Sequence, residues 1–183
     1  MKTKKNIHKA LLILLTKKTL SQIKVTELCR EAAINRGTFY FHYEEVGDVF
    51  EELFEDIMLD LKQSYEEPYK NGFANNIQYL DPKTVKIFDH VKKHEDFYKI
   101  VLSENVVMKY YYMLYDHIYM LSHTNTFEED NGMKERFYNS YGANAIIGLI
   151  IEWYRNDFIN SVEEMNELLV NIVNQRYLDE LKQ

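Results

Sequence analysis

The sequence predicts an all-α protein of about nine helices, and three observations support that class. Long stretches are rich in Leu, Glu, Lys, Ala and Met, which favour helices. The 183 residues include only six glycines and two prolines, whereas loop-rich β architectures need many of both for their turns. Because 46% of the residues are apolar, the chain can bury a sizeable core. We expect an N-terminal three-helix domain at residues 1–62 and a C-terminal helical bundle at residues 63–183.

The N-terminal part is predicted to contain three helices followed by a longer one. Apolar residues recur at helical spacing over residues 4–18, which predicts the first helix. Two short helices, at 26–33 and 36–42, should stand on either side of a tight turn, with Thr26 as the cap of the earlier one. Acidic residues then open a fourth helix at 44–67, which carries a continuous apolar stripe.

The remaining helices are separated by residues that typically end or begin a helix. Pro68 is expected to end the fourth helix, and residues 71–81 to form a loop. Asp81 suits the cap of the next helix and Pro82 its first position. Further helices are predicted at 95–102, 106–122, 133–156 and 161–181, with a mobile acidic loop at 122–132.

Charge is divided unevenly along the chain. Residues 1–43 carry nine Lys or Arg and two acidic residues, a net charge of +7. Residues 44–183 carry 13 Lys or Arg and 27 acidic residues, a net charge of −14. A basic N-terminal part on an acidic body suggests that this part binds a polyanion, although solvated surface charge gives the same count.

Cysteine content and hydropathy limit the class of protein further. Cys29 is the one cysteine, which excludes an internal disulfide framework and fits a reducing cytoplasm. The short apolar run near the N-terminus has no cleavage site after it, so we expect no signal peptide. No apolar stretch approaches the ~20 residues that a membrane-spanning helix needs.

The two short helices and their turn indicate DNA binding. Two helices joined by a tight turn form a helix-turn-helix, whose second helix enters the major groove. The segment KVTELCREAAINRGTFYFHYEEVGDVFEELF moreover resembles the DNA-binding domain of the TetR family of bacterial transcriptional regulators. That family has a small helix ending in Ala-Gly or Ala-Ala, a turn, and then Gly/Ser-Thr-aromatic-Tyr-x-His/Tyr-Phe/Tyr. Ala32-Ala33 and residues 37–43 occupy these places here.

A second segment extends the resemblance into the body. YNSYGANAIIGLIIEWYRNDF resembles a helix of the TetR branch linked to regulation of dihydroxyacetone kinase. The resemblance implies a dimeric cytoplasmic regulator that binds double-stranded DNA at a palindromic operator. A repressor released by a small-molecule effector fits that plan, and the sequence leaves an activator, or a regulator that binds a protein, open.

Particular roles follow for the second short helix. Phe39 should point inward, and the resemblance assigns phosphate contacts to Tyr40 and His42. Arg36 suits guanine and Phe41 a thymine methyl group, whereas Gly37 lets the backbone approach the sugar-phosphate closely. The full set expected to contact DNA is Lys24, Thr26, Asn35, Arg36, Gly37, Thr38, Tyr40, Phe41, His42 and Tyr43. Alternatively, these aromatic residues form a hydrophobic corner of a helical bundle and have no role in binding.

The start of the fourth helix departs from the family pattern. Relatives usually have Lys near the position of Val46, where it meets a phosphate, but here Glu44 and Glu45 precede this position. A phosphate is repelled by these acids, so this side should contribute less affinity. The departure leaves open a helical interaction protein or activator with weakened DNA binding.

The last two helices are the expected dimer interface. Small and apolar residues share one stripe on each helix, which permits a four-helix bundle between two subunits. The interface residues predicted are Tyr141, Ala145, Gly148, Glu152, Met165, Leu169, Ile172 and Val173. Alternatively, both helices belong to the core of the monomer.

A Tyr- and Met-rich run, residues 109–120, is expected to be buried on more than one side. It is either ordinary core or one wall of an effector pocket, since Tyr and Met line adaptable sites. The pocket residues predicted are Phe88, Tyr111, Tyr115, Tyr119 and Trp153.

Catalysis, metal binding and cofactor binding are not expected. The chain has no Gly-rich phosphate loop, nucleophile elbow or zincin motif, so we predict no enzyme and no cofactor beyond an effector. His90 and His94 form an i, i+4 pair that can ligate a metal. Lysines surround them, and a solvated face with no metal is the prediction.

Overall fold

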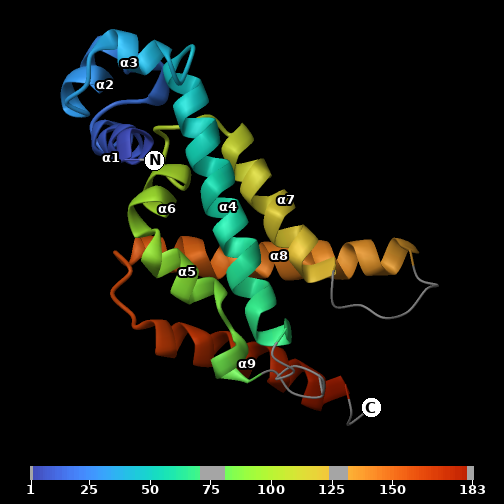
Figure 1. Cartoon of the computed structure of the whole chain (residues 1–183). Helices are drawn as coiled ribbons and strands as arrows, with labels where there is room; N and C mark the ends of the chain where they lie inside the picture. Colours follow the sequence, from blue (N-terminus) through green and yellow to red (C-terminus); the bar gives the residue numbers. More distant parts are fainter. Residues whose placement is uncertain (1, 71–80, 124–131, 181–183) are drawn as a thin grey trace. The chain divides into compact units, whose positions relative to one another are not determined.

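The computed structural model describes residues 2–70, 81–123 and 132–180 (Figure 1). The described residues form nine α-helices and two 3-10 helices without any strand, which confirms the all-α class. The elements are α1 (Lys2–Leu15), η1 (Leu20–Gln22), α2 (Val25–Glu31), α3 (Arg36–Tyr40), α4 (Val46–Lys70), η2 (Pro82–Thr84), α5 (Ile87–Lys93), α6 (Glu95–Val101), α7 (Lys109–His123), α8 (Gly132–Arg155) and α9 (Val162–Glu180).

The helices divide into two compact units, each of which is made from separate stretches of the chain. Unit 1 contains Met1–Leu59 and Glu95–Tyr112, and unit 2 contains Asp60–His94 and Met113–Gln183. The helices α4 and α7 therefore each continue from one unit into the other. The sequence-based division placed residues 95–112 in the C-terminal part, whereas they cluster with the N-terminal helices.

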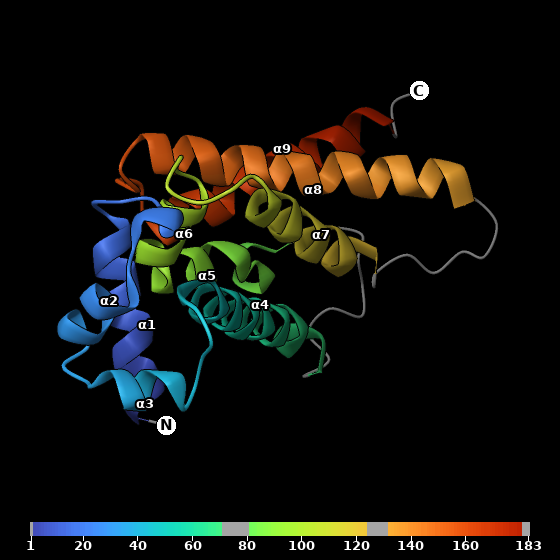
Figure 2. The same cartoon turned by 90° about the horizontal axis from the view of Figure 1, so that it is seen from above.

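The core of unit 1 is formed by buried apolar residues of α1, α2, α3, α6 and the first half of α4. Figure 2 shows these helices from above. The apolar face of α1 is buried as its spacing predicts, and Leu28 and Phe39 are fully enclosed beside it. Phe50 of α4 meets Tyr110 of α7 edge to face, with 4.6 Å between ring centroids. Phe97 of α6 stacks on Phe50 at 6.2 Å. These aromatic contacts join residues 95–112 to the N-terminal helices.

Asn105 secures the same junction with two hydrogen bonds. Its carbonyl oxygen accepts the backbone N–H of Leu20 at 2.9 Å. Its side-chain amide donates to the carbonyl oxygen of Leu15 at 2.9 Å, near the end of α1. The last turn of a helix leaves carbonyl groups without partners inside the helix, and Asn105 satisfies one of them.

Cys29 lies inside α2, where it packs as a small apolar residue. Its side chain is buried, and burial raises the pKa of the thiol. A thiol is a poor nucleophile while it stays protonated, so this position serves packing.

The core of unit 2 is built around Trp153 of α8. Trp153 makes edge-to-face contacts with Phe88 of α5 and with Phe158, at 5.8 and 5.1 Å between ring centroids. Its indole N–H donates to the carbonyl oxygen of Asn160 at 3.1 Å, so the buried ring leaves no unpaired donor. The chain then enters α9, where Ser161 and Glu164 exchange hydrogen bonds in a capping box.

Several helix boundaries differ from the prediction. Pro68 does not end α4, which continues to Lys70. A proline within a helix costs about 3 kcal/mol, which neighbouring turns can offset. Asp81 does cap a helix, accepting the N–H of Lys83 at 2.9 Å, but that helix is only the 3-10 turn η2. The loops predicted at 71–81 and 122–132 lie largely outside the described residues.

The Tyr-rich helix α7 is fully buried along one stripe, and not on more than one side as predicted. One stripe faces the interior, including Leu114 and Ile118, whereas Tyr112 and Met120 are 61% and 65% exposed. The helix α7 is therefore amphipathic, although its sequence is rich in apolar residues. None of the helices in the described ranges is long and apolar enough to cross a membrane.

Candidate nucleic-acid interface

The helices α2 and α3 form a helix-turn-helix within unit 1. α2 ends at Glu31, and Ala33 adopts the left-handed conformation with φ of 52°. This residue redirects the chain, and the N–H of Ile34 then returns to the carbonyl oxygen of Cys29 at 3.0 Å. A left-handed residue after the last turn is a common helix ending, although glycine usually fills it.

Asn35 begins α3 as its N-cap. Its side-chain Oδ1 accepts the backbone N–H of Thr38 at 2.7 Å and the Thr38 hydroxyl at 3.0 Å. A helix of five residues is too short to be stable alone, so this cap and the packing of Phe39 hold it in place. Because Oδ1 already accepts these two bonds, Asn35 could contact a base only by donating from its side-chain amide N–H groups.

The outer face of α3 is exposed and carries one cation and two aromatic rings. Phe39 is fully buried, as predicted, whereas Tyr40 is half exposed and Phe41 is 83% exposed. The Arg36 guanidinium lies 5.7 Å from the centroid of the Tyr40 ring and 3.5 Å from its hydroxyl. This contact holds the guanidinium over the exposed face. Of the other predicted contacts, Gly37 is exposed, and Thr38 and His42 are half-buried.

The start of α2 differs from the prediction in its cap. Lys24, rather than Thr26, occupies the N-cap position, and the Glu27 carboxylate accepts its backbone N–H at 3.5 Å. Glu27 also pairs with Lys18. Thr26 as a cap is therefore wrong, because it lies inside the first turn. Both Lys24 and Thr26 remain exposed.

Tyr43 does not lie on the exposed face, which corrects its expected contact with DNA. Its side chain is 6% exposed, and its hydroxyl donates to Glu52 Oε1 at 2.9 Å. His8 Nε2 lies 3.2 Å from the same hydroxyl, and Lys4 pairs with Glu52. Burial and the bond to Glu52 raise the pKa of Tyr43 well above its usual range. Tyr43 instead joins the segment after α3 to α1 and α4.

The N-terminus of α4 is occupied by its own acidic side chain. Asp48 Oδ2 accepts the backbone N–H groups of Glu44 and Glu45, each at 2.9 Å. Val46 is buried and contributes to the core. Two backbone amides just before α4 therefore already have a carboxylate partner, with which a phosphate would have to compete.

The predicted effector pocket is not formed by the residues expected. Phe88 and Trp153 are enclosed in the core of unit 2 and pack against each other. Tyr111, Tyr115 and Tyr119 are half-buried along α7, and the Tyr115 hydroxyl donates to Ser140 Oγ at 2.8 Å. None of the five lines the main apolar cavity of unit 2.

That cavity, called here the α8–α9 groove, has a volume of about 460 Å³. Residues of α7, α8 and α9 and the start of α5 surround it. Five of its lining residues belong to the set predicted for the dimer interface: Tyr141, Ala145, Leu169, Ile172 and Val173. The groove also includes Ile118 and Leu121, which the sequence-based prediction missed. Their i, i+3 spacing marks an apolar stripe, but nothing in the sequence shows which helix that stripe faces.

The remaining interface residues divide between surface and core. Gly148 and Glu152 are exposed, whereas Met165 is buried and belongs to the core of the monomer, which corrects its expected role. Large apolar side chains on α8 and α9 nevertheless remain exposed. They are Met133, Phe137, Tyr138, Tyr141, Leu168, Ile172 and Val173. Contiguous apolar patches of exposed side chains are typical of interaction surfaces.

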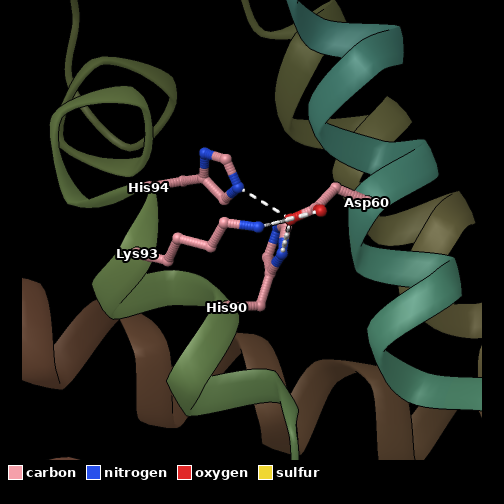
Figure 3. A network of polar contacts seen from close by, with 4 residues as sticks. All are labelled: Asp60, His90, Lys93 and His94. Atoms are coloured by element: carbon pink, nitrogen blue, oxygen red, sulfur yellow. Dashed lines mark hydrogen bonds and ion pairs between the residues drawn. The ribbon is translucent and has the colours of Figure 1, made fainter. Parts of the chain in front are cut away.

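The pair His90 and His94 does not form a solvated face. His90 is 2% exposed, and His94 is half-buried. Both point to Asp60 of α4, together with Lys93 (Figure 3). The surrounding lysines suggested solvent exposure, but α4 covers this face of α5.

Comparisons with known proteins agree with the helix-turn-helix and the helical body. Residues 78–175, more than half of the chain, match the TetR_C_8 family, a transcriptional regulator C-terminal region. The chain is 19% identical over 172 residues to the HTH-type transcriptional regulator YxbF of Bacillus subtilis (strain 168). That match covers 93% of this chain but 44% of the relative, so the chain spans less than half of its length.

Two solved structures share the fold. The dihydroxyacetone kinase operon activator DhaS is 19% identical, with a TM-score of 0.64 and coverage of 98% of this chain and 96% of its own. The fatty acid degradation regulator FadR from Bacillus halodurans is 16% identical, with a TM-score of 0.57 and coverage of 91% and 94%. At these identities the likeness concerns the fold.

Proposed function

The chain belongs to the TetR family of transcriptional regulators, and we propose that it acts as a homodimeric repressor at a palindromic operator. The observation that carries this proposal is the exposed face of α3, where Arg36, Tyr40 and Phe41 stand out from a helix that Asn35 caps and Phe39 anchors. A short helix held this rigidly presents its side chains to the major groove in fixed positions. Residues 1–62 would bind DNA, and residues 63–183 would dimerise and bind an effector.

Side chains of α3 would divide their roles between bases and phosphates. Arg36 reaches guanine O6 and N7, and Phe41 contacts a thymine methyl group. Tyr40 and His42 donate to phosphate oxygens, as do Lys24 and Thr26 at the start of α2. The net charge of +7 over residues 1–43 supports this footprint, because phosphate contacts supply most of the salt-dependent affinity.

Dimerisation would use the exposed apolar side chains of α8 and α9. Tyr141, Ile172 and Val173 are each about half exposed, and Ala145, Gly148 and Glu152 extend the same surface. A two-fold interface places the same surface on both subunits. The two copies of α3 would then meet half-sites about 34–36 Å apart.

An effector would enter the deep part of the α8–α9 groove. Its volume of about 460 Å³ suits a small molecule, and its buried lining includes Ile118, Leu121 and Leu169. Because mouth residues such as Tyr141 and Ile172 are also proposed for the interface, binding there would alter subunit packing and thereby release the operator.

An activator role is the second candidate. One specific observation favours it: Asp48 accepts the backbone N–H groups of Glu44 and Glu45 at the start of α4, and these acidic residues would weaken one side of the DNA footprint. The structurally similar DhaS is described as an operon activator. We propose no enzymatic activity, because the matched relatives are transcriptional regulators.

The test is selection of bound fragments from the source genome, followed by titration of the selected duplex by fluorescence anisotropy. Arg36→Ala should weaken binding by ~1–3 kcal/mol and relax one base position. Arg155→Ala, an exposed arginine on α8, is the matched control and should bind as the wild type does. Affinity should fall steeply as salt rises. Equal, weak and unselective binding by wild type and Arg36→Ala would refute the proposal.

A further inference from the structure

Three cationic or imidazole groups converge on one carboxylate oxygen in unit 2. Asp60 Oδ2 lies 2.8 Å from His94 Nε2, 2.8 Å from Lys93 Nζ and 3.2 Å from His90 Nδ1 (Figure 3). Asp60 comes from α4, and the other three come from α5 and its C-cap. Two helices about thirty residues apart in sequence are thus joined at a single atom.

The spacing of these donors suits a metal ion. One ligand atom from each of Asp60, His90 and His94 lies within 4.8 Å of the others. A tetrahedral ion with ligands at about 2.0–2.2 Å separates its donors by roughly 3.3–3.6 Å. The distances of 2.8 and 3.2 Å from Asp60 need to open by less than 1 Å. The i, i+4 spacing also places both imidazole rings on one helix face, with centroids 4.6 Å apart.

We propose that Asp60, His90 and His94 form a binding site for a divalent first-row transition metal ion of the Zn²⁺ class. The ion would replace the Lys93 ammonium, whose side chain is 60% exposed and free to move into solvent. Each imidazole N–H now directed at Asp60 would shift its hydrogen to the other ring nitrogen. Imidazole and carboxylate together favour zinc and its neighbours, and three protein ligands leave a position for water.

A second cluster of similar composition provides an internal comparison. His8, Glu52 and Asp56 of unit 1 also bring three ligand atoms within 4.8 Å. There, however, Glu52 accepts hydrogen bonds from both Lys4 and Tyr43. A metal would have to break the hydrogen bond from the buried Tyr43 as well as the part-buried ion pair with Lys4, so this cluster serves packing.

The proposal is tested with tag-free full-length protein, stripped with chelator and titrated with Zn²⁺ by calorimetry. Co²⁺ is the spectroscopic probe, because its visible absorption reports imidazole ligands and coordination geometry. We expect one ion per chain at micromolar concentration. His94→Gln and Asp60→Asn should each weaken binding by at least about tenfold. Lys93→Gln should strengthen it, because the competing cation is removed.

Matched controls separate this site from others. Lys83→Gln removes an exposed lysine within η2 and should leave the affinity unchanged, as should His8→Gln. Circular dichroism confirms that each variant is folded, and the partly exposed His94 is the ligand whose change disturbs the core least. The proposal is overturned if neither wild type nor Lys93→Gln binds one ion. It is equally overturned if His94→Gln binds as wild type does, or if His8→Gln loses the ion.

Discussion

Asn35 Oδ1 accepts two hydrogen bonds from Thr38, one from its backbone N–H and one from its hydroxyl. The residue that the sequence predicts to contact a base therefore also caps α3. A substitution that removes the acceptor changes the stability of α3 together with its contacts, so two substitutions are needed to separate these effects.

Asn35→Ala should lower the free energy of unfolding by about 1 kcal/mol, because it removes the cap. Asn35→Asp keeps an acceptor at the cap and should leave stability within about 0.5 kcal/mol of wild type. Its negative charge should nevertheless weaken operator binding. Urea unfolding and anisotropy titration measure the two effects. A capping role is excluded if Asn35→Ala unfolds at the same urea concentration as wild type.

The left-handed turn at Ala33 predicts a stabilising substitution. An alanine with φ of 52° bears a conformational cost that glycine avoids. Ala33→Gly should raise the free energy of unfolding by about 0.5–1 kcal/mol after the entropy that glycine gains in the unfolded chain. Ala32→Gly is the control. Ala32 is buried and has a φ of −79°, which alanine adopts without strain, so glycine there should lower the free energy of unfolding. Thermal unfolding of both variants decides, and a loss of stability in both would contradict the argument.

Tyr40 and Tyr43 form a matched pair that separates binding from packing. Tyr43→Phe removes the hydroxyl that donates to Glu52 and should cost about 1–2 kcal/mol of stability. The folded fraction should still bind operator as wild type does. Tyr40→Phe should leave stability within about 0.5 kcal/mol and weaken operator binding, because the hydroxyl is exposed. Reversed results for the two variants would place Tyr43, and not Tyr40, at the DNA.

His8 predicts a dependence of stability on pH. Burial lowers the pKa of His8 below its ordinary value of 6.5, so the unfolded chain binds this proton more readily than the folded chain. Stability should therefore fall as the pH decreases from 6.5 towards the lowered pKa. His8→Gln should flatten this part of the curve, measured by urea unfolding between pH 7 and pH 5. An unchanged slope in the variant would assign the effect to other groups.

Subunit association is predicted to depend on α9. Val173→Glu places a charge on a half-exposed apolar surface and should shift the dimer towards monomer in analytical ultracentrifugation. Ile159→Glu makes the same change at a side chain that is 82% exposed between α8 and α9, and should leave the dimer intact. The α8–α9 interface fails if both variants sediment as wild type does, or if wild type is already monomeric.

The sequence predicts helices well where local pattern determines them. The buried face of α1 and the inward direction of Phe39 follow from spacing alone. Tyr43 could not be assigned in this way, because its partner Glu52 is nine residues away and His8 thirty-five. A tyrosine suits a phosphate and a buried carboxylate equally well, and only the tertiary fold decides between them.

Interior positions in the body were harder to predict for the same reason. Met165 and Leu169 lie on one stripe of α9, yet the first enters the core and the second lines the groove. The sequence predicted a solvated His90 because lysines surround it, but Asp60, from a helix far away in the sequence, contacts it. Periodicity identifies the apolar face of a helix without identifying the neighbour that this face meets.

Cys29 has a practical consequence for following the protein in solution. Its thiol is buried, and burial raises the pKa of the thiol, so alkylating probes should react with it slowly while the protein is folded. A second cysteine introduced at exposed Arg30 would then accept a spin label selectively in an otherwise unaltered background. Distances between the labels on the two subunits of a dimer would report the separation of the two helix-turn-helix units, with and without an operator.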